Sequence, residues 1–138
     1  MNQPGKFQIL SLDGGGIRGL YSAAILAKWE EDLHCSIADH FDLIVGTSTG
    51  GIIALGLGLG LKPREIVQFY LTKGAQIFPN GWIPGYRGLR QYFANKFSAK
   101  PLEASLKDCF GDKVLGNSAK RLIVPSFDLG QTSVSPHY

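Results

Sequence analysis

Residues 41–60 read FDLIVGTSTGGIIALGLGLG, and this stretch decides the fold. Phe41–Val45 is a short apolar run that ends in β-branched residues, which predicts a buried strand. Gly51–Leu55 is apolar enough to form a buried helix. The intervening residues 46–50, GTSTG, are rich in glycine and small polar side chains. The stretch therefore predicts a strand, a tight turn and a helix in succession.

Ser48 lies in the middle of this predicted turn. Gly46 and Gly50 flank it at two positions on either side, which is the spacing of a nucleophile elbow between strand and helix. Glycine is required at both positions because a side chain there would collide with the neighbouring strand or helix. The turn places the Ser48 hydroxyl at the carboxyl end of the strand, next to the first amides of the helix. We therefore expect Ser48 to be a reactive, exposed serine.

The same stretch has an alternative interpretation as a membrane-spanning helix. Leu43–Leu61 contains no charged residue, and a run of this length can cross a bilayer. It also contains six glycines and three threonine or serine residues, which is a poor composition for a spanning helix. We therefore favour the buried strand, turn and helix.

Size and composition indicate one ordinary soluble domain. The chain has 138 residues, of which 44% are hydrophobic. Met1–Gly5 is polar, and the apolar run Phe7–Leu12 is too short for a signal peptide. Cys35 and Cys109 form no metal-binding spacing and no disulfide framework, which favours a reducing compartment. We expect a cytoplasmic protein.

The charge is distributed unevenly along the chain. Residues 1–61 carry three basic and six acidic side chains, whereas residues 62–121 carry eleven basic and four acidic ones. Within the basic half, residues 82–100 interleave arginine and lysine with aromatic residues, as headgroup-contacting segments do. The alternative is a loop that packs its aromatic side chains over the edge of the sheet. We expect peripheral membrane contact and no nucleic-acid partner.

A second glycine-rich segment follows the first predicted strand, Phe7–Leu12. Residues 13–19 read DGGGIRG and lead into a predicted helix over Leu20–Leu33. In such a loop, backbone amides and the helix dipole converge on a negative oxygen. Gly14-x-Gly16-x-x-Gly19 formally matches the dinucleotide-binding fingerprint. The loop also suits an oxyanion hole for a serine on the next strand.

The end of the second predicted strand favours the oxyanion hole. A dinucleotide fold needs a carboxylate there to hold the ribose, but the only nearby acids, Asp39 and Asp42, precede the strand or open it. A P-loop is excluded because no lysine follows the glycines around Ser48. An amide cradle beside an exposed serine fits acyl transfer, so the dinucleotide interpretation is the more remote one.

Together, Asp-Gly-Gly-Gly-Ile-Arg-Gly at 13–19 and Gly-Thr-Ser-Thr-Gly-Gly at 46–51 resemble the patatin-like phospholipase family. The resemblance implies a three-layer α/β/α fold with a mainly parallel sheet, related to the α/β hydrolases. It implies a lipid acyl hydrolase that uses a Ser–Asp dyad on a phospholipid or other acyl lipid. The sequence indicates no metal or organic cofactor. The resemblance assigns the nucleophile to Ser48 and the oxyanion amides to Gly15, Gly16 and Arg18. The motif glycines are Gly14, Gly19, Gly46 and Gly50.

One part of the family pattern is absent. The family's catalytic Asp lies downstream in an Asp-Gly-Gly or Asp-Gly-Ala motif, but the only Asp-Gly pair here is Asp13-Gly14. His34, His40 and His137 lie in no stretch that marks a catalytic base. We therefore expect residues 1–138 to be the N-terminal part of one catalytic domain, ending before the catalytic Asp motif and inactive alone. The alternative is a fragment that binds lipid or a partner without turnover.

The remaining sequence predicts four further segments. A helix begins near Pro63, an irregular loop covers Gly74–Gly88, a helix covers Pro101–Phe110 and a third strand covers Arg121–Phe127.

Overall fold

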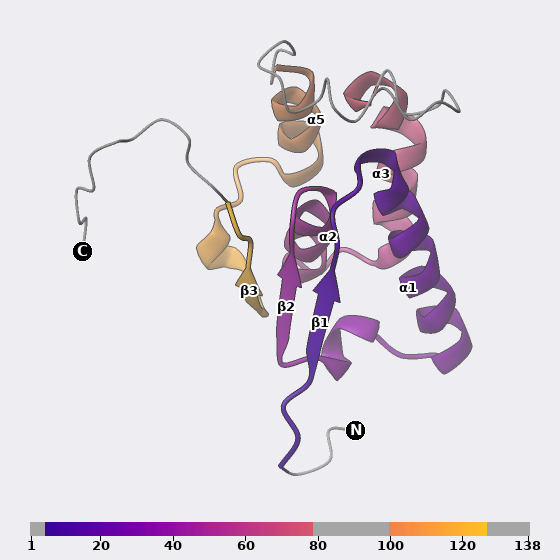
Figure 1. Cartoon of the computed structure of the whole chain (residues 1–138), viewed down its shortest axis with the longest axis vertical. Helices are drawn as coiled ribbons and strands as arrows, with labels where there is room; N and C mark the ends of the chain where they lie inside the picture. Colours follow the sequence, from indigo (N-terminus) through magenta and orange to yellow (C-terminus); the bar gives the residue numbers. More distant parts are fainter. Residues whose placement is uncertain (1–4, 79–99, 127–138) are drawn as a thin grey trace, which may run out of the picture.

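Three short parallel strands form the sheet of this protein, whose computed structural model describes residues 5–78 and 100–126. The strands follow the order β1-β2-β3 (Figure 1): β1 is Ile9–Leu12, β2 is Leu43–Gly46 and β3 is Arg121–Ile123. Helical segments separate the strands along the chain, as parallel pairing requires. The expected α/β class with a parallel sheet is therefore confirmed.

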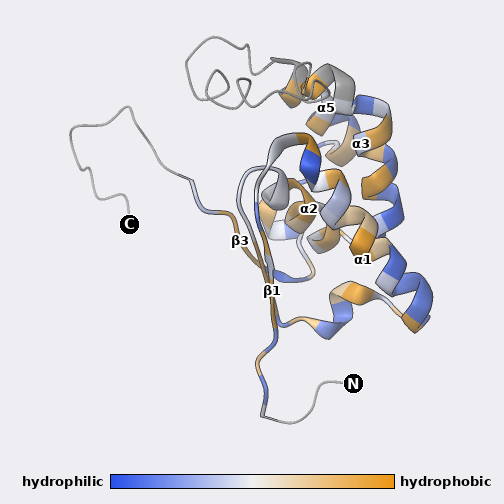
Figure 2. Ribbon diagram, turned by 45° about the vertical axis from the view of Figure 1, so that its right-hand side comes forward, coloured by the Kyte–Doolittle hydropathy of each residue, from blue (hydrophilic) through white to orange (hydrophobic). Residues whose placement is uncertain are grey.

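One face of the sheet carries the core. Leu10, Leu12 and Ile44 are buried on this face, and alternate positions point to the other face. There, Ile9 and Ile123 are 54% and 49% exposed. The described helices all lie on the one side of the sheet (Figure 2). Helices on the second face, which the expected three-layer architecture requires, are not among the described residues and stay a prediction.

Helix α2, Thr49–Gly58, occupies the centre of the core. Nine of its ten residues are buried, because it lies between the sheet and the other helices. Its glycines allow close packing: a β-carbon on Gly56 would lie 3.0 Å from Ile66 Cδ1, and one on Gly58 would lie 2.8 Å from Leu122 Cδ1. Within the described ranges, no helix has both the length and the apolar character that crossing a membrane requires.

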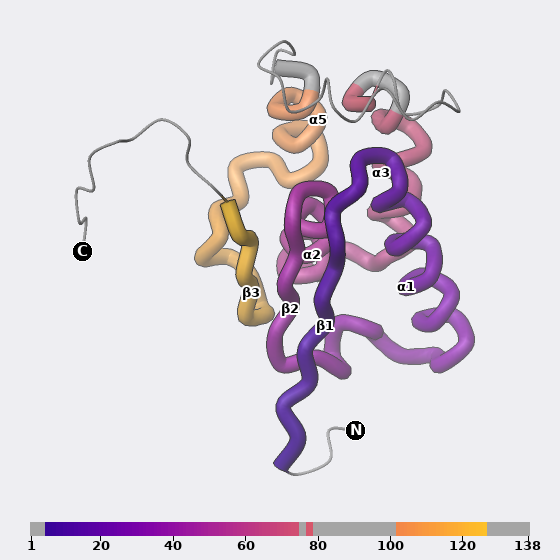
Figure 3. The backbone as a smooth tube through the Cα atoms, in the orientation of Figure 1, coloured from indigo at the N-terminus to yellow at the C-terminus, as the bar shows by residue number. Residues whose placement is uncertain are grey.

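Two longer helices cover α2 from outside. Helix α1, Gly19–Leu33, lies beside α3, Pro63–Ile77, and α5, Lys100–Phe110, packs against α3 (Figures 1 and 3). Three short 3-10 turns complete the described elements: η1 at Gly16–Arg18, η2 at Ile37–His40 and η3 at Leu115–Asn117.

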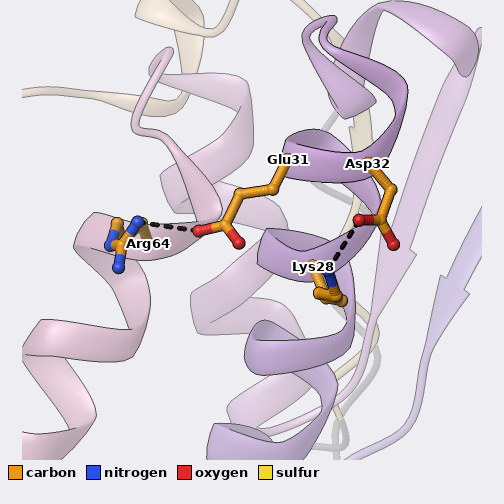
Figure 4. A network of polar contacts seen from close by, with 4 residues as sticks. All are labelled: Lys28, Glu31, Asp32 and Arg64. Carbon is orange, nitrogen blue, oxygen red and sulfur yellow. Dashed lines mark hydrogen bonds and ion pairs between the residues drawn. The ribbon is translucent and has the colours of Figure 1, made fainter.

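Two exposed ion pairs involve side chains of α1. Arg64 Nη1 of α3 lies 2.7 Å from Glu31 Oε1 of α1, and Lys28 Nζ lies 2.6 Å from Asp32 Oδ1 within α1 (Figure 4). Each side chain in these two pairs is at least half exposed, so water and salt screen the interactions. Such exposed pairs contribute little to stability, and burial around α2 holds the helices together.

Two predicted boundaries were wrong by more than two residues. Helix α3 continues through Ile77, although Gly74–Ile77 was expected to begin an irregular loop. Gly74 suits the helix because a β-carbon there would approach Ile17 Cδ1 to 2.7 Å, so the residue lets α3 pass close to η1. Strand β3 ends at Ile123, short of Phe127, because Pro125 has no amide hydrogen to continue the ladder. Residues 79–88 of the predicted loop, and nearly all of the basic, aromatic segment 82–100, lie outside the described residues.

Candidate active site

Ser48 adopts backbone angles that residues with side chains rarely take. It joins the end of β2 at Gly46 to the start of α2 at Thr49, with φ 53° and ψ −120°. Among the described non-glycine residues, only Ser48 and His34 have a positive φ. Strain of this kind costs about 1–3 kcal/mol and persists only where the surrounding structure enforces it. The Ser48 residue is exposed, so the strained turn holds its hydroxyl at the surface.

The glycines that flank Ser48 enforce this turn by close approach. A β-carbon on Gly46 would overlap the carbonyl oxygen of Gly50, and one on Gly50 would overlap the carbonyl oxygen of Leu12. Both obstacles are backbone atoms of packed elements and cannot move aside as a side chain can. These close approaches explain why the tight turn needs glycine at positions 46 and 50.

The glycine loop after β1 lies directly against the turn. The Thr47 amide donates to the carbonyl oxygen of Leu12 at 3.2 Å. A β-carbon on Gly14 would lie only 2.8 Å from the β-carbon of Ser48. The two motifs, more than thirty residues apart in the sequence, thus meet at the carboxyl ends of β1 and β2. This is the meeting that the sequence predicted.

Two threonines connect the loop to the turn. The Gly14 amide donates to Thr47 Oγ1 at 3.1 Å, and the Gly15 amide donates to Thr49 Oγ1 at 3.2 Å. Neither threonine belongs to the residues that the sequence predicts at the site. The sequence shows that threonine stands on each side of Ser48, but it does not show where the two hydroxyls point.

The three amides expected to form the oxyanion hole differ in their partners. The Gly15 amide is bonded to Thr49, and the Arg18 amide donates to the Gly15 carbonyl oxygen at 3.3 Å. The Arg18 side chain also reaches this oxygen, through Nε at 3.4 Å. For the Gly16 amide, no acceptor is found within residues 5–78 and 100–126. Gly16 has φ +61°, which glycine adopts without strain.

Tyr70 holds the residue that follows Ser48 through a buried hydrogen bond. Its hydroxyl donates to the Thr49 carbonyl oxygen at 3.1 Å, and the side chain is 1% exposed. Burial raises the pKa of the Tyr70 phenol, so the group stays protonated and remains a donor. Gly19 makes room for it, since a β-carbon there would lie 2.9 Å from the Tyr70 oxygen.

The described histidines lie at the other end of the sheet. His34 directly follows the last residue of α1, and His40 Nε2 is 3.0 Å from Cys35 Sγ. Both precede β2, whereas Ser48 follows it. Asp108 and Asp112 bind lysines, at 3.0 Å from Lys73 and 4.0 Å from Lys107. His137 and Asp128 lie outside the described residues, which contain no group of three or more His, Cys, Asp or Glu side chains able to hold a metal.

Comparison with known proteins gives matches over most of the chain. The sequence model of the family described as patatin-like phospholipase matches residues 10–137. The chain is 36% identical to a "cGAMP-activated phospholipase" of Pseudomonas aeruginosa (strain BWHPSA011 / Pa011) over 136 residues, which cover 96% of the chain and 40% of that protein. It is 34% identical to the Vibrio cholerae protein of the same name over 137 residues, covering 90% and 39%.

A plant protein is similar to the same extent. "Patatin-like protein 2" of Oryza sativa subsp. indica is 33% identical over 137 residues, which cover 88% of the chain and 34% of that protein. The chain thus spans 34–40% of the length of these three relatives. The match extends over nearly all of the chain and includes both glycine motifs at the site. This chain belongs to the patatin-like phospholipase family.

Proposed function

We propose that the natural protein is a serine lipid acyl hydrolase, an esterase of phospholipase A type, with Ser48 as its nucleophile. The observation that carries the proposal is the exposed Ser48 at φ 53°, with the glycine loop packed against it. A strained, exposed serine between a strand and a buried helix is the geometry of a nucleophile elbow. Family membership and relatives named phospholipase support a lipid ester as the substrate.

In this mechanism, Ser48 Oγ attacks the ester carbonyl carbon and gives its proton to a carboxylate base. Negative charge develops on the carbonyl oxygen, and amides of the 14–19 loop stabilise it. The alcohol portion of the lipid leaves with a proton, and the acyl group stays on Ser48. Water then releases the fatty acid and restores the serine.

Among the proposed oxyanion donors Gly15, Gly16 and Arg18, Gly16 is the best supported. Its amide has no acceptor among the described residues and belongs to the loop that contacts Ser48. The other two amides already have acceptors, Thr49 Oγ1 and the Gly15 carbonyl oxygen. Either must therefore share its hydrogen or exchange its partner to bind an oxyanion.

The base of the proposed Ser–Asp dyad is an Asp outside residues 1–138, in the family's Asp-Gly-Gly or Asp-Gly-Ala motif. Residues 1–138 are then the N-terminal part of one catalytic domain, in keeping with their span of 34–40% of the relatives' length. No metal or organic cofactor enters this mechanism. Cytoplasmic location stays a prediction from the sequence.

The competing function is binding of acyl lipid or of a partner protein without turnover. A fluorophosphonate probe separates the two, because it reacts with activated serines. In the natural protein, including any residues outside 1–138, we expect labelling at Ser48 alone, located by peptide mapping. We also expect release of fatty acid from phospholipid vesicles, detected by mass spectrometry. Absence of both labelling and release would favour the binding function.

Residues 1–138 alone are expected to be close to inactive. A serine hydroxyl is a weak nucleophile until a base takes its proton, and the one Asp-Gly pair present belongs to the glycine loop. Without a base, an oxyanion hole retains only about 10³–10⁴-fold catalysis over water. The measurement is hydrolysis of a short-chain ester by purified residues 1–138, with Ser48→Ala in the same fragment as the control. Strong hydrolysis that depends on Ser48 would place a base within these residues.

We also propose peripheral membrane contact through residues 82–100. Its support is the alternation of basic and aromatic side chains in the sequence of this segment. Binding to anionic vesicles is expected to weaken as salt is raised, because charges are screened within about 8–10 Å at physiological ionic strength. Sedimentation with vesicles at low and high salt measures this. Equal binding to neutral and anionic vesicles at low salt would instead favour packing of the segment against the protein.

A further inference from the structure

The threonines on either side of Ser48 hold two consecutive amides of the glycine loop. Thr47 Oγ1 accepts from the Gly14 amide, and Thr49 Oγ1 accepts from the Gly15 amide. These bonds link residues 33 and 34 positions apart in the sequence. They are side-chain contacts on either side of the proposed nucleophile, and the mechanism above does not use them.

We propose that Thr47 and Thr49 are positioning residues, which fix the oxyanion loop relative to Ser48; this inference rests on the proposed function. Residues 14–16 are three consecutive glycines, and glycine has the most freely rotating backbone of all residues. Each peptide group is planar, so the two threonine bonds hold the peptide planes that lead up to the Gly15 α-carbon, from which the Gly16 amide continues. Arg18 holds the Gly15 carbonyl oxygen, which shares its peptide plane with the Gly16 amide. The threonines thereby anchor the part of the loop before Gly16 to the turn around Ser48.

The two threonines contribute unequally. Thr49 is 2% exposed, and Tyr70 holds its carbonyl oxygen, so its hydroxyl has one fixed place. Loss of that hydroxyl leaves the half-buried Gly15 amide without its acceptor. Thr47 is exposed, and water can replace its hydroxyl at the Gly14 amide. Removal of the Thr49 hydroxyl is therefore the more damaging change.

The decisive variant is Thr49→Val in the natural protein, because valine keeps the shape of threonine and removes the acceptor. A misplaced oxyanion loop should lower kcat by about 10–100-fold, since errors of about 1 Å in catalytic groups have effects of this size. The KM should stay within about threefold, because ground-state binding of the lipid is unchanged. Thr49→Ser restores the hydroxyl and should recover kcat to within about threefold of the parent.

A second readout reports on the oxyanion directly. A trifluoromethyl ketone analogue of the lipid adds to the serine hydroxyl and places a negative oxygen in the hole. Its inhibition constant should rise by about the same factor by which kcat/KM falls in Thr49→Val, because both measure transition-state binding. A purely structural role of Thr49 would lower the melting temperature without this parallel change.

Three further variants complete the test. Thr47→Val should raise the inhibition constant about threefold to tenfold, less than Thr49→Val does, because water can fill the exposed site. Thr72→Val is the matched control: its hydroxyl donates to the Gln68 carbonyl oxygen within α3, and kinetics should not change. Ser48→Ala tests the proposed function separately. If hydrolysis depends on Ser48 but neither threonine variant changes kcat or inhibition, the positioning role is wrong. If Thr49→Val does not fold, Thr47→Val decides: an unchanged inhibition constant overturns the inference, and a rise supports it.

Discussion

Replacing Ser48 with alanine is expected to reduce lipid ester hydrolysis by the natural protein by about 10⁴-fold or more, since removal of the nucleophile from a serine protease costs about 10⁶-fold. Alanine has no hydroxyl to form the acyl intermediate, and water in its place is a poorer and less well positioned nucleophile. Ser48 is exposed, so stability should change little. The comparison needs initial rates on the same lipid and thermal unfolding of both proteins.

Ser48→Gly serves as the companion variant. Glycine adopts a positive φ without the strain that serine bears, but it has a larger backbone entropy in the unfolded chain. We expect this variant to be as inactive as Ser48→Ala yet more stable by up to about 2 kcal/mol, the difference between the two effects. A clear loss of stability in Ser48→Gly would show that the φ of 53° is not a source of strain.

Replacing Gly50 with alanine is expected to have the largest effect on stability. The added β-carbon would overlap the carbonyl oxygen of Leu12, which ends β1 and already accepts from the Thr47 amide. Overpacking a core usually lowers stability by about 1–3 kcal/mol. The atom that the new β-carbon would meet belongs to the backbone and cannot move aside, so the loss should reach or exceed the upper end of that range. We expect a loss of about 3 kcal/mol or more, measured by chemical denaturation, together with loss of hydrolysis.

Gly116→Ala is the matched control for this substitution. A β-carbon at Gly116 meets no atom within 4 Å, and the residue has no positive φ. Its free energy of unfolding should therefore stay within about 0.5 kcal/mol of the parent protein. If Gly50→Ala were as stable as Gly116→Ala, the turn could not approach β1 as closely as it does in this structure.

Local sequence patterns predicted the elements around the site because each element has its own signal. Short apolar runs predicted β1 and β2, and the glycine spacing around Ser48 predicted its turn. The Thr49 hydroxyl and the Tyr70 hydroxyl gave no such signal. Their partners, Gly15 and the Thr49 carbonyl oxygen, lie 34 and 21 residues away in the sequence. Such contacts depend on how packed elements meet, and residue type alone does not determine that.

The boundary error in α3 has the same origin. Gly74 is a weak helix former, so local propensity predicted that the helix would end there. In the fold, the absence of a side chain at Gly74 lets α3 approach Ile17 of η1, and packing outweighs propensity. The catalytic base could not be assigned to a residue for a different reason. The family resemblance implies an Asp-Gly motif for it, but the one Asp-Gly pair in residues 1–138 belongs to the glycine loop.

The burial of α2 has a consequence for how the site moves. The helix that begins directly after Ser48 is enclosed along nearly its whole length, and the Ile52 amide donates to the Ser48 carbonyl oxygen at 3.2 Å. Such a helix has no low-energy route to fray from its first turn, because fraying would separate the sheet from α1 and α3. Its amides should therefore exchange with deuterium only when the whole domain opens. The serine then keeps its strained geometry for the lifetime of the folded state.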